Sequence, residues 1–187
     1  MKRKNERKLT YSMLKIFSTQ INGLFKKMID HEEFNIEDAA RLLAQAVIGE
    51  GSIYIYGFEE MDGITKEALN GVEPLPAAKV YYLDEPLTLG SEDRFLLFSR
   101  FSNDPEAIRL AQRLQQADIP FVAVSTVVEA ESDSLTTLAD VHIDLRVQRG
   151  LIPDELGNRV GYPTLLIALF AYYGIKFTIE EILQEYQ

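Results

Sequence analysis

The sequence of 187 residues contains no cysteine and only two histidines, His31 and His142. Without cysteine, the chain can form no disulfide bond, no thiolate metal site and no cysteine nucleophile. Two histidines are too few for a histidine-rich metal centre. We therefore expect a protein that uses neither a metal nor a cofactor.

Long apolar runs are also missing. The run Leu165–Tyr173 is too short to span a bilayer. Residues 11–28, which follow the basic start of the chain, form an amphipathic pattern and not the unbroken apolar segment of a secretory signal. The sequence therefore predicts a cytoplasmic protein without a membrane partner.

Basic residues are outnumbered, with 19 Lys and Arg against 29 Asp and Glu and a net charge of −10. Such an acidic surface repels nucleic-acid phosphates, so we expect no nucleic-acid partner. Residues 1–8 are the exception, because they carry five basic side chains against one acidic one. We interpret this start as a frayed, solubilising terminus, the alternative being contact with an anionic surface.

Two helices are expected before the first strand. In residues 11–28, apolar side chains recur at spacings of three and four and form one stripe. This stripe can pack on the body of the protein or pair with a second chain. A second helix is expected to begin at Asn35, which can cap it, and to end at Gly49 and Gly51.

Five short β-rich runs follow and alternate with helical patterns such as Pro105–Ala117. Three of these runs are nearly all apolar, as strands buried on both faces must be. The alternation predicts a three-layer α/β fold with a five-stranded parallel sheet and right-handed crossovers. The five runs are 52–56, 79–83, 94–98, 121–124 and 141–145.

The C-terminal part is predicted to form two helices. Pro163–Tyr173 is apolar on nearly all sides, which indicates a buried helix or a subunit interface. Gly174 would end this helix, and Thr178 with Glu181 would form a capping box for the next one. The expected parts of this single domain are an N-terminal helix (1–34), a core (35–146) and C-terminal helices (147–187).

Polar residues follow three of the predicted strands. In a parallel sheet, ligands bind beyond the carboxyl ends of the strands, near the switch in strand order. A helix begins directly after the second of these loops, and the free amides at a helix start commonly bind phosphate. The loops are Gly57–Met61, Ser99–Asp104 and Ser125–Ser134.

These segments resemble the sugar-isomerase (SIS) family. Leu97–Glu106 is similar to the strand–loop–helix of SIS domains, in the form seen in phosphoheptose isomerases. Phe121–Thr126 resembles the next strand of the family, and Ser134–Val141 resembles its P-L-A-x-x-A-D-V stretch. Ile53–Gly57 resembles the opening strand, so the likeness covers about residues 35–146.

The resemblance implies a phosphosugar held by serine and threonine hydroxyls, and a homodimer or tetramer. Members of the family interconvert aldose and ketose phosphates, process amino sugars, or sense phosphosugars within transcription regulators. We therefore expect a small phosphorylated sugar as ligand. The expected contacts are Gly57, Ser99, Arg100, Ser102, Asn103, Ser125, Thr126 and Ser134, with Ser132 and Asp133 approaching from the last loop.

An isomerase also needs a general base near the sugar C1–C2 bond. Glu59 and Glu60 follow the first strand and are the candidates, the alternative being a solvated acidic pair. His142 lies within a predicted strand, where we expect a packed or surface histidine. His31 would reach a pocket only in an oligomer, and then that of a neighbouring subunit.

Several positions depart from the family pattern. Asp104 stands in place of serine or threonine, and its carboxylate can cap the helix beginning at Pro105 and repel a phosphate. Arg100 can bind a phosphate or form an ion pair with Asp104 or Glu106. The other departures are Glu59 and Ser102 in place of glycine, and Met61 and Phe101 in place of serine.

Three functions therefore compete. The resemblance implies a phosphosugar enzyme similar to phosphoheptose isomerase. The altered loops favour a non-catalytic sensor of phosphosugars or other small anions, or a structural dimer whose pocket is lost. Phosphosugar binding by an SIS protein is the prediction shared by the first two.

Overall fold

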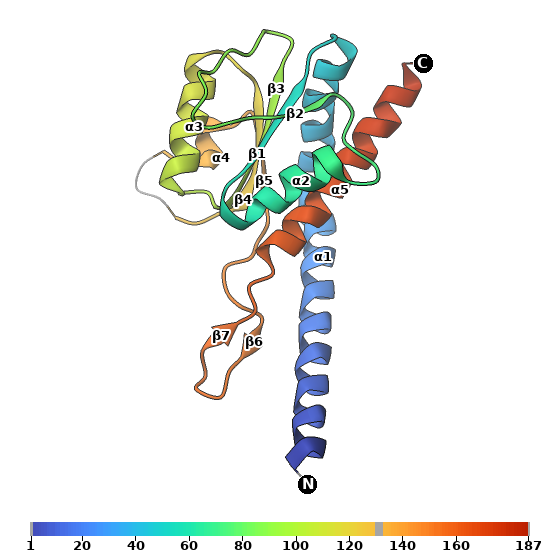
Figure 1. The fold of residues 1–187 in the computed structure, drawn as a ribbon, viewed down its shortest axis with the longest axis vertical. Helices are drawn as coiled ribbons and strands as arrows, with labels where there is room; N and C mark the ends of the chain where they lie inside the picture. Colours follow the sequence, from blue (N-terminus) through green and yellow to red (C-terminus); the bar gives the residue numbers. More distant parts are fainter. Residues whose placement is uncertain (1, 130–132, 187) are drawn as a thin grey trace.

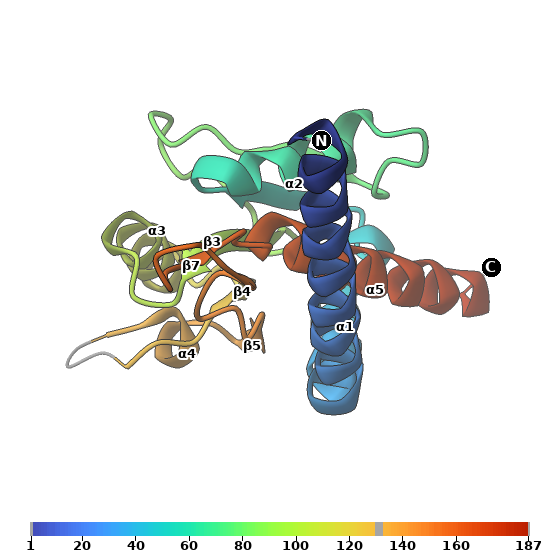
Figure 2. The ribbon, with the colours of Figure 1, turned by 90° about the horizontal axis from the view of Figure 1, so that it is seen from below.

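The computed structural model describes residues 2–129 and 133–186, with side chains from residue 13 onward, so the basic side chains at the start of the chain lie outside it. Its centre is a five-stranded parallel sheet with helices on both faces, as the sequence predicts (Figures 1 and 2). The strand order is β2-β1-β3-β4-β5. The strands are β1 Ile53–Gly57, β2 Ala78–Val80, β3 Arg94–Phe101, β4 Phe121–Thr126 and β5 Val141–Asp144.

Three helices cover one face of the sheet, and two helices cover the other. The first group is α1 (Lys2–Ile48), α2 (Asp62–Asn70) and α5 (Thr164–Glu185), and the second is α3 (Pro105–Gln116) and α4 (Leu135–Leu138). A short 3₁₀ turn, η1 (Glu59–Met61), joins β1 to α2, and a two-stranded hairpin of β6 (Ile152–Pro153) and β7 (Arg159–Val160) hangs below the sheet beside α1 (Figure 1).

Strand side chains alternate between two separate apolar clusters, because successive residues of a strand point to opposite faces. In β3, Leu96 and Phe98 pack toward α1 and α5, whereas Phe95 and Leu97 pack toward α3. These four side chains are fully buried. A parallel sheet covered on both faces leaves its carboxyl edge as the place where polar groups can gather.

The expected break between two N-terminal helices is wrong, because α1 runs without interruption from Lys2 to Ile48. Asn35 lies inside this helix, and its side-chain amide donates a hydrogen bond to Glu32 Oε2 at 2.8 Å instead of capping a helix start. Met28 and Ala39, on either side of Asn35, are both buried in the same apolar cluster. The packing of one continuous stripe therefore overrides the local capping signal.

The expected break at Gly174 is also wrong, because α5 is a single helix from Thr164 to Glu185. A Cβ atom at Gly174 would lie 3.3 Å from the Ile36 side chain, so the glycine allows α1 and α5 to approach closely. Thr178 does not cap a helix; its hydroxyl donates to the carbonyl oxygen of Gly174 one turn earlier, at 3.0 Å. Of the helices formed by the described residues, none is both long and apolar enough to cross a membrane.

Candidate functional site

The strand order changes direction between β1 and β3, where ligands bind in parallel sheets of this kind, and we call the carboxyl ends of these two strands the crevice. Gly57 ends β1, and a Cβ atom there would lie 2.2 Å from the carbonyl oxygen of Met61. Only glycine permits η1 to turn so tightly against the strand. In β3, the register with β4 shifts between Phe98 and Phe101, so Ser99 and Arg100 lie in an irregular stretch at the crevice. Such irregularities are common beside functional sites.

An ion pair spans this crevice. Arg100 of β3 donates from Nε to Glu60 Oε1 at 2.7 Å and from Nη2 to Glu60 Oε2 at 2.5 Å. The Arg100 side chain keeps 47% of its surface exposed and that of Glu60 keeps 32%. The hydrogen bond from Arg100 lowers the pKa of the Glu60 carboxyl below its ordinary value. The sequence predicted an ion pair for Arg100, but named Asp104 and Glu106 as partners instead of Glu60.

The start of α3 is occupied by a carboxylate of the chain itself. Asp104 Oδ1 accepts the backbone N–H of Glu106 at 3.0 Å and that of Ala107 at 3.5 Å. Pro105 follows at the first helical position, which lacks an amide donor. The Ser99 hydroxyl adds a hydrogen bond to Asp104 Oδ2 at 3.2 Å. Asp104 therefore takes the amide positions that a phosphate would use at this helix start, as its sequence position predicts.

Other expected contact residues use their hydroxyls inside the protein. Ser102 is buried and accepts the N–H of Val128 at 3.1 Å, which ties the end of β3 to the segment after β4. Ser134 is buried and caps α4 through the N–H of Thr136 at 3.1 Å. These hydroxyls fix the loops around the crevice instead of pointing into it.

The expected pair Ser125 and Thr126 divides between the two faces of the sheet. Thr126 accepts the N–H of Val147 at 3.3 Å, on the face that α1 covers. The Ser125 hydroxyl lies 2.8 Å from His142 Nε2, with both residues on neighbouring strands β4 and β5. Burial lowers the pKa of His142 below its ordinary value of 6.5, although Asp144 and Glu32 oppose this effect. Ser125 therefore bonds to a neutral imidazole near pH 7.

Exposed groups at the crevice are few. Asn103 and Glu59 are exposed, and Glu59 has a backbone φ of 51°, in the left-handed region that glycine favours. Asp133 accepts a hydrogen bond from Gln112 of α3 at 3.0 Å, and Ser132 lies outside the described residues. Within residues 2–129 and 133–186, no group of three acidic or histidine side chains could hold a metal ion. The crevice thus offers one cation, Arg100, and several carboxylates.

Residues 13–183 match the family described as a domain of unknown function, DUF2529. The chain belongs to the DUF2529 family. The Bacillus subtilis (strain 168) protein described as "Uncharacterized protein YwjG" is 42% identical over 174 residues, which cover 93% of this DUF2529 chain and 99% of that protein.

Solved structures show that this DUF2529 chain has the SIS fold. An Escherichia coli CFT073 protein in complex with a phosphosugar matches with a TM-score of 0.65 at 12% identity, covering 94% of this chain and 92% of that one. The phosphoheptose isomerase GmhA from Neisseria gonorrhoeae matches with a TM-score of 0.61 at 13% identity, covering 92% of this chain and 99% of that one. The sugar isomerase domain of an RpiR transcription factor from Sphaerobacter thermophilus matches with a TM-score of 0.56 at 12% identity, covering 91% of this chain and 97% of that one. Identities this low establish the fold alone.

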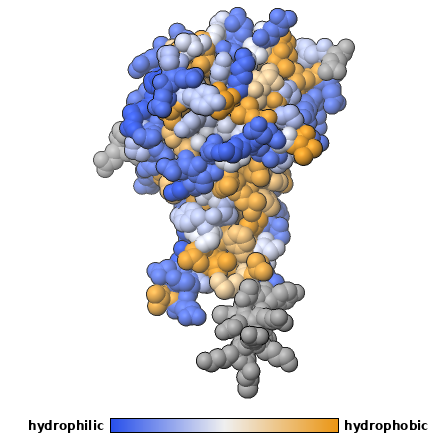
Figure 3. All heavy atoms as spheres, in the orientation of Figure 1, coloured by the Kyte–Doolittle hydropathy of each residue, from blue (hydrophilic) through white to orange (hydrophobic). Residues whose placement is uncertain are grey.

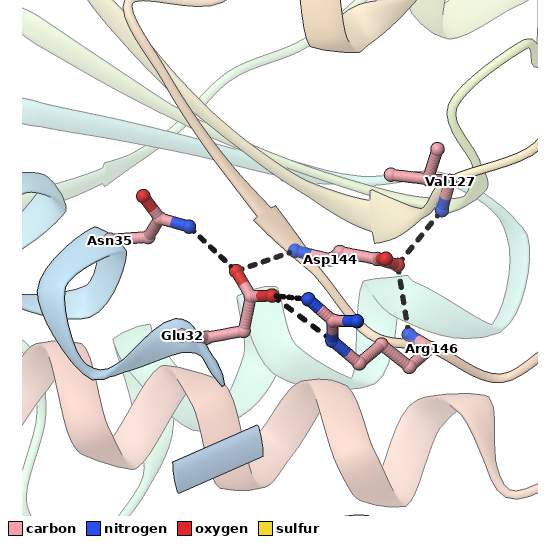
Figure 4. A network of polar contacts seen from close by, with 5 residues as sticks. All are labelled: Glu32, Asn35, Val127, Asp144 and Arg146. Carbon is pink, nitrogen blue, oxygen red and sulfur yellow. Dashed lines mark hydrogen bonds and ion pairs between the residues drawn. The ribbon is translucent and has the colours of Figure 1, made fainter. Parts of the chain in front are cut away.

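A second polar network in the DUF2529 chain was not expected from the sequence. Glu32 of α1 is 2% exposed and accepts two hydrogen bonds from Arg146, at 3.1 and 2.6 Å (Figure 4). It also accepts the backbone N–H of Asp144 at 3.3 Å. No local pattern signals this network, because Glu32 meets Arg146 and the backbone of Asp144 more than 110 residues later in the chain.

We predict that His142 makes the stability of this DUF2529 protein depend on pH. Because the folded state holds the pKa of His142 below that of the unfolded chain, stability should fall as pH drops from about 6.5 toward the folded pKa. His142→Gln keeps a hydrogen-bonding partner for Ser125 and should remove this fall. Urea unfolding across the weakly acidic range measures it.

The control is His31→Gln, which alters an exposed residue and leaves the Ser125–His142 contact intact. Equal pH dependence of wild type and His142→Gln would show that His142 does not titrate between the two states.

Proposed function

We propose that this DUF2529 protein binds a phosphorylated sugar at the crevice between β1 and β3 and does not convert it. The observation that carries the proposal is the Arg100–Glu60 ion pair, which holds a half-exposed guanidinium across the switch point of the sheet. The likeness to SIS structures supports the ligand class, because one of them is a complex with a phosphosugar. The residues 1–187 would act as one domain in this role.

Binding would exchange one anion for another at Arg100. The guanidinium presents two parallel donors to Glu60, and a phosphate can accept the same pair of donors. The release of Glu60 costs little, since partly exposed ion pairs contribute about 0–1 kcal/mol. The Ser99 hydroxyl, next to Arg100, is bound to Asp104 and becomes available once Asp104 moves. The exposed Asn103 amide would contact the sugar hydroxyls.

Two features favour binding without catalysis. Glu60, one of the two candidate bases, is held by Arg100, and a carboxylate whose pKa is lowered is a weaker proton acceptor. Asp104 fills the start of α3, where the positive end of the helix dipole would otherwise stabilise the phosphate. A protein with these properties would bind a phosphosugar with low affinity and would act as a sensor.

A second candidate function is a sugar-phosphate isomerase similar to the phosphoheptose isomerases, which Glu59 favours. Its backbone is held in the left-handed region, which is costly for a residue other than glycine. Such strain gathers at active sites. Glu59 is exposed at the end of β1, and within the described part of the chain its carboxylate has no ion-pair partner. In this mechanism Glu59 would remove the proton from the sugar carbon.

We also propose that the protein self-associates through α1 and α5, as the family resemblance implies. The first turns of α1 extend beyond the sheet, and an isolated helix is only marginally stable in water (Figure 1). Figure 3 shows hydrophobic residues gathered where α1 leaves the body. Leu14 there is 61% exposed and Ile16 is 41% exposed. A second copy packed along this segment would bury exposed apolar surface of α1.

For phosphosugar binding, we predict that Arg100→Gln weakens the affinity for fructose 6-phosphate at least about tenfold, the loss expected when a charge-assisted contact is removed. Asp104→Ser should strengthen binding, because serine still caps α3 but carries no charge. Isothermal titration with fructose 6-phosphate and sedoheptulose 7-phosphate measures both effects. Arg109→Gln, which breaks the exposed Arg109–Glu106 pair on α3, is the matched control. Weaker binding by Asp104→Ser would contradict this account of the loop.

For the isomerase alternative, the test is turnover. If Glu59 is a base, Glu59→Gln should lower kcat for aldose–ketose conversion by roughly a hundredfold or more with little change in KM, and Glu60→Gln should lower it less. Binding without any turnover in the wild-type protein would reject the enzyme and leave the binding proposal in place.

For self-association, we predict that wild-type protein forms a dimer or larger oligomer and that Leu14→Glu shifts it toward monomer. A carboxylate buried at an interface without a partner is strongly unfavourable. Size-exclusion chromatography with light scattering measures the mass. Leu156→Glu, at an 87% exposed position in the turn between β6 and β7, serves as control. A monomeric wild-type protein would reject the interface.

A further inference from the structure

A groove of about 450 Å³ lies between α1 and the segment that follows β5. Its charged lining residues are Lys27 of α1 together with Asp144, Arg146 and Arg149, and His31 of α1 lines it as well. We call this site the basic groove. Three of its side chains are permanently cationic, in a chain whose net charge is −10.

Two of these cations are not neutralised within the protein. Within the part of the chain that the structure describes, no ion pair or hydrogen bond involves the side chain of Lys27 or that of Arg149. Both residues are exposed. Acidic side chains are abundant elsewhere on this protein, so two cations left together at one groove attract an anion from solution.

The third cation, Arg146, is held in a fixed orientation. Glu32 is buried and accepts hydrogen bonds from Nε and Nη2 of Arg146, while Asn35 donates to the other oxygen of Glu32 (Figure 4). Arg146 still keeps 38% of its side-chain surface exposed, and its Nη1 has no acceptor within the described residues. The guanidinium is therefore anchored on one side and offers donors on the other.

Among the described residues, Asp144 is the one carboxylate that lines the groove, and it is already engaged. Asp144 Oδ1 accepts the backbone N–H of Val127 at 3.0 Å and that of Arg146 at 2.9 Å (Figure 4). Backbone donors stabilise this charge and hold it within the loop. The groove therefore presents a net positive charge to a ligand.

We propose that the basic groove binds a small organic molecule that carries a phosphate or pyrophosphate group. Lys27 and Arg149, the two cations without an internal partner, match an anion of two charges, and guanidinium groups bind phosphate oxygens bidentately. The side chains of Leu24 and Val147 add an apolar wall, and Gln148 offers an amide for the hydroxyls of the ligand. The volume fits a phosphorylated small molecule.

This site is separate from the crevice of the proposed function. The basic groove borders β5 at one edge of the sheet, whereas the crevice lies between β1 and β3. With neighbouring strands about 4.8 Å apart, β5 is roughly 14 Å from β1. The two sites share no residue, so each can be removed without the other.

The test is isothermal titration of the full chain with inorganic pyrophosphate, at low and high salt. We expect binding with a Kd below about 1 mM at low salt that weakens as salt screens the cations. The double substitution Lys27→Met with Arg149→Gln should weaken it at least about tenfold. Lys26→Met, at the neighbouring exposed position that does not line the groove, should leave it unchanged. If the double variant does not fold, each single variant should weaken binding by itself.

Arg100→Gln separates the two proposals. Pyrophosphate binding that survives Arg100→Gln and fails in the double variant supports the basic groove. Binding that fails in Arg100→Gln and survives in the double variant overturns it while supporting the crevice. Absence of pyrophosphate binding by the wild-type protein at low salt also overturns it, and says nothing against fructose 6-phosphate binding at Arg100.

Discussion

A parallel sheet has to be covered on both faces, and this requirement organises the whole protein. Burial of about 25 cal/mol per Å² of apolar surface draws α1, α2 and α5 onto one face and α3 and α4 onto the other. The polar ends of the strands are then left at one edge. Gly57, Ser99 and Ser125 come to this edge because all five strands run in the same direction.

At that edge, the protein satisfies its own polar groups. Asp104 accepts hydrogen bonds from the first amides of α3, and Glu60 accepts them from the guanidinium of Arg100. Ser102 accepts a hydrogen bond from the N–H of Val128. Each contact engages a polar group that would otherwise be free to meet a ligand. A ligand at the crevice must compete with these internal partners, so its affinity is a difference between two sets of hydrogen bonds. If the crevice binds a ligand as we propose, the ion pair and the cap would limit its affinity more than the hydroxyls do.

The strands were predictable because their apolar runs are local, and the cap at Asp104 was predictable because it depends on Pro105 and on neighbouring amides. The partner of Arg100 was not, since Glu60 is 40 residues away and meets it only across the switch point. Asn35 was misassigned for a similar reason: its partner Glu32 is fixed by Arg146, 114 residues later. Gly174 was misassigned because its small size serves the close approach of Ile36 and does not end a helix. Local signals fail where distant packing provides a different partner.

The anchoring of Glu32 has a mechanical consequence. α1 is one stiff rod, and its buried attachment to the end of β5 lies about 30 residues from its start, or roughly 45 Å at 1.5 Å per residue. Arg146 belongs both to this attachment and to the lining of the basic groove. An anion bound in the groove would therefore touch a side chain that also ties α1 to the end of β5.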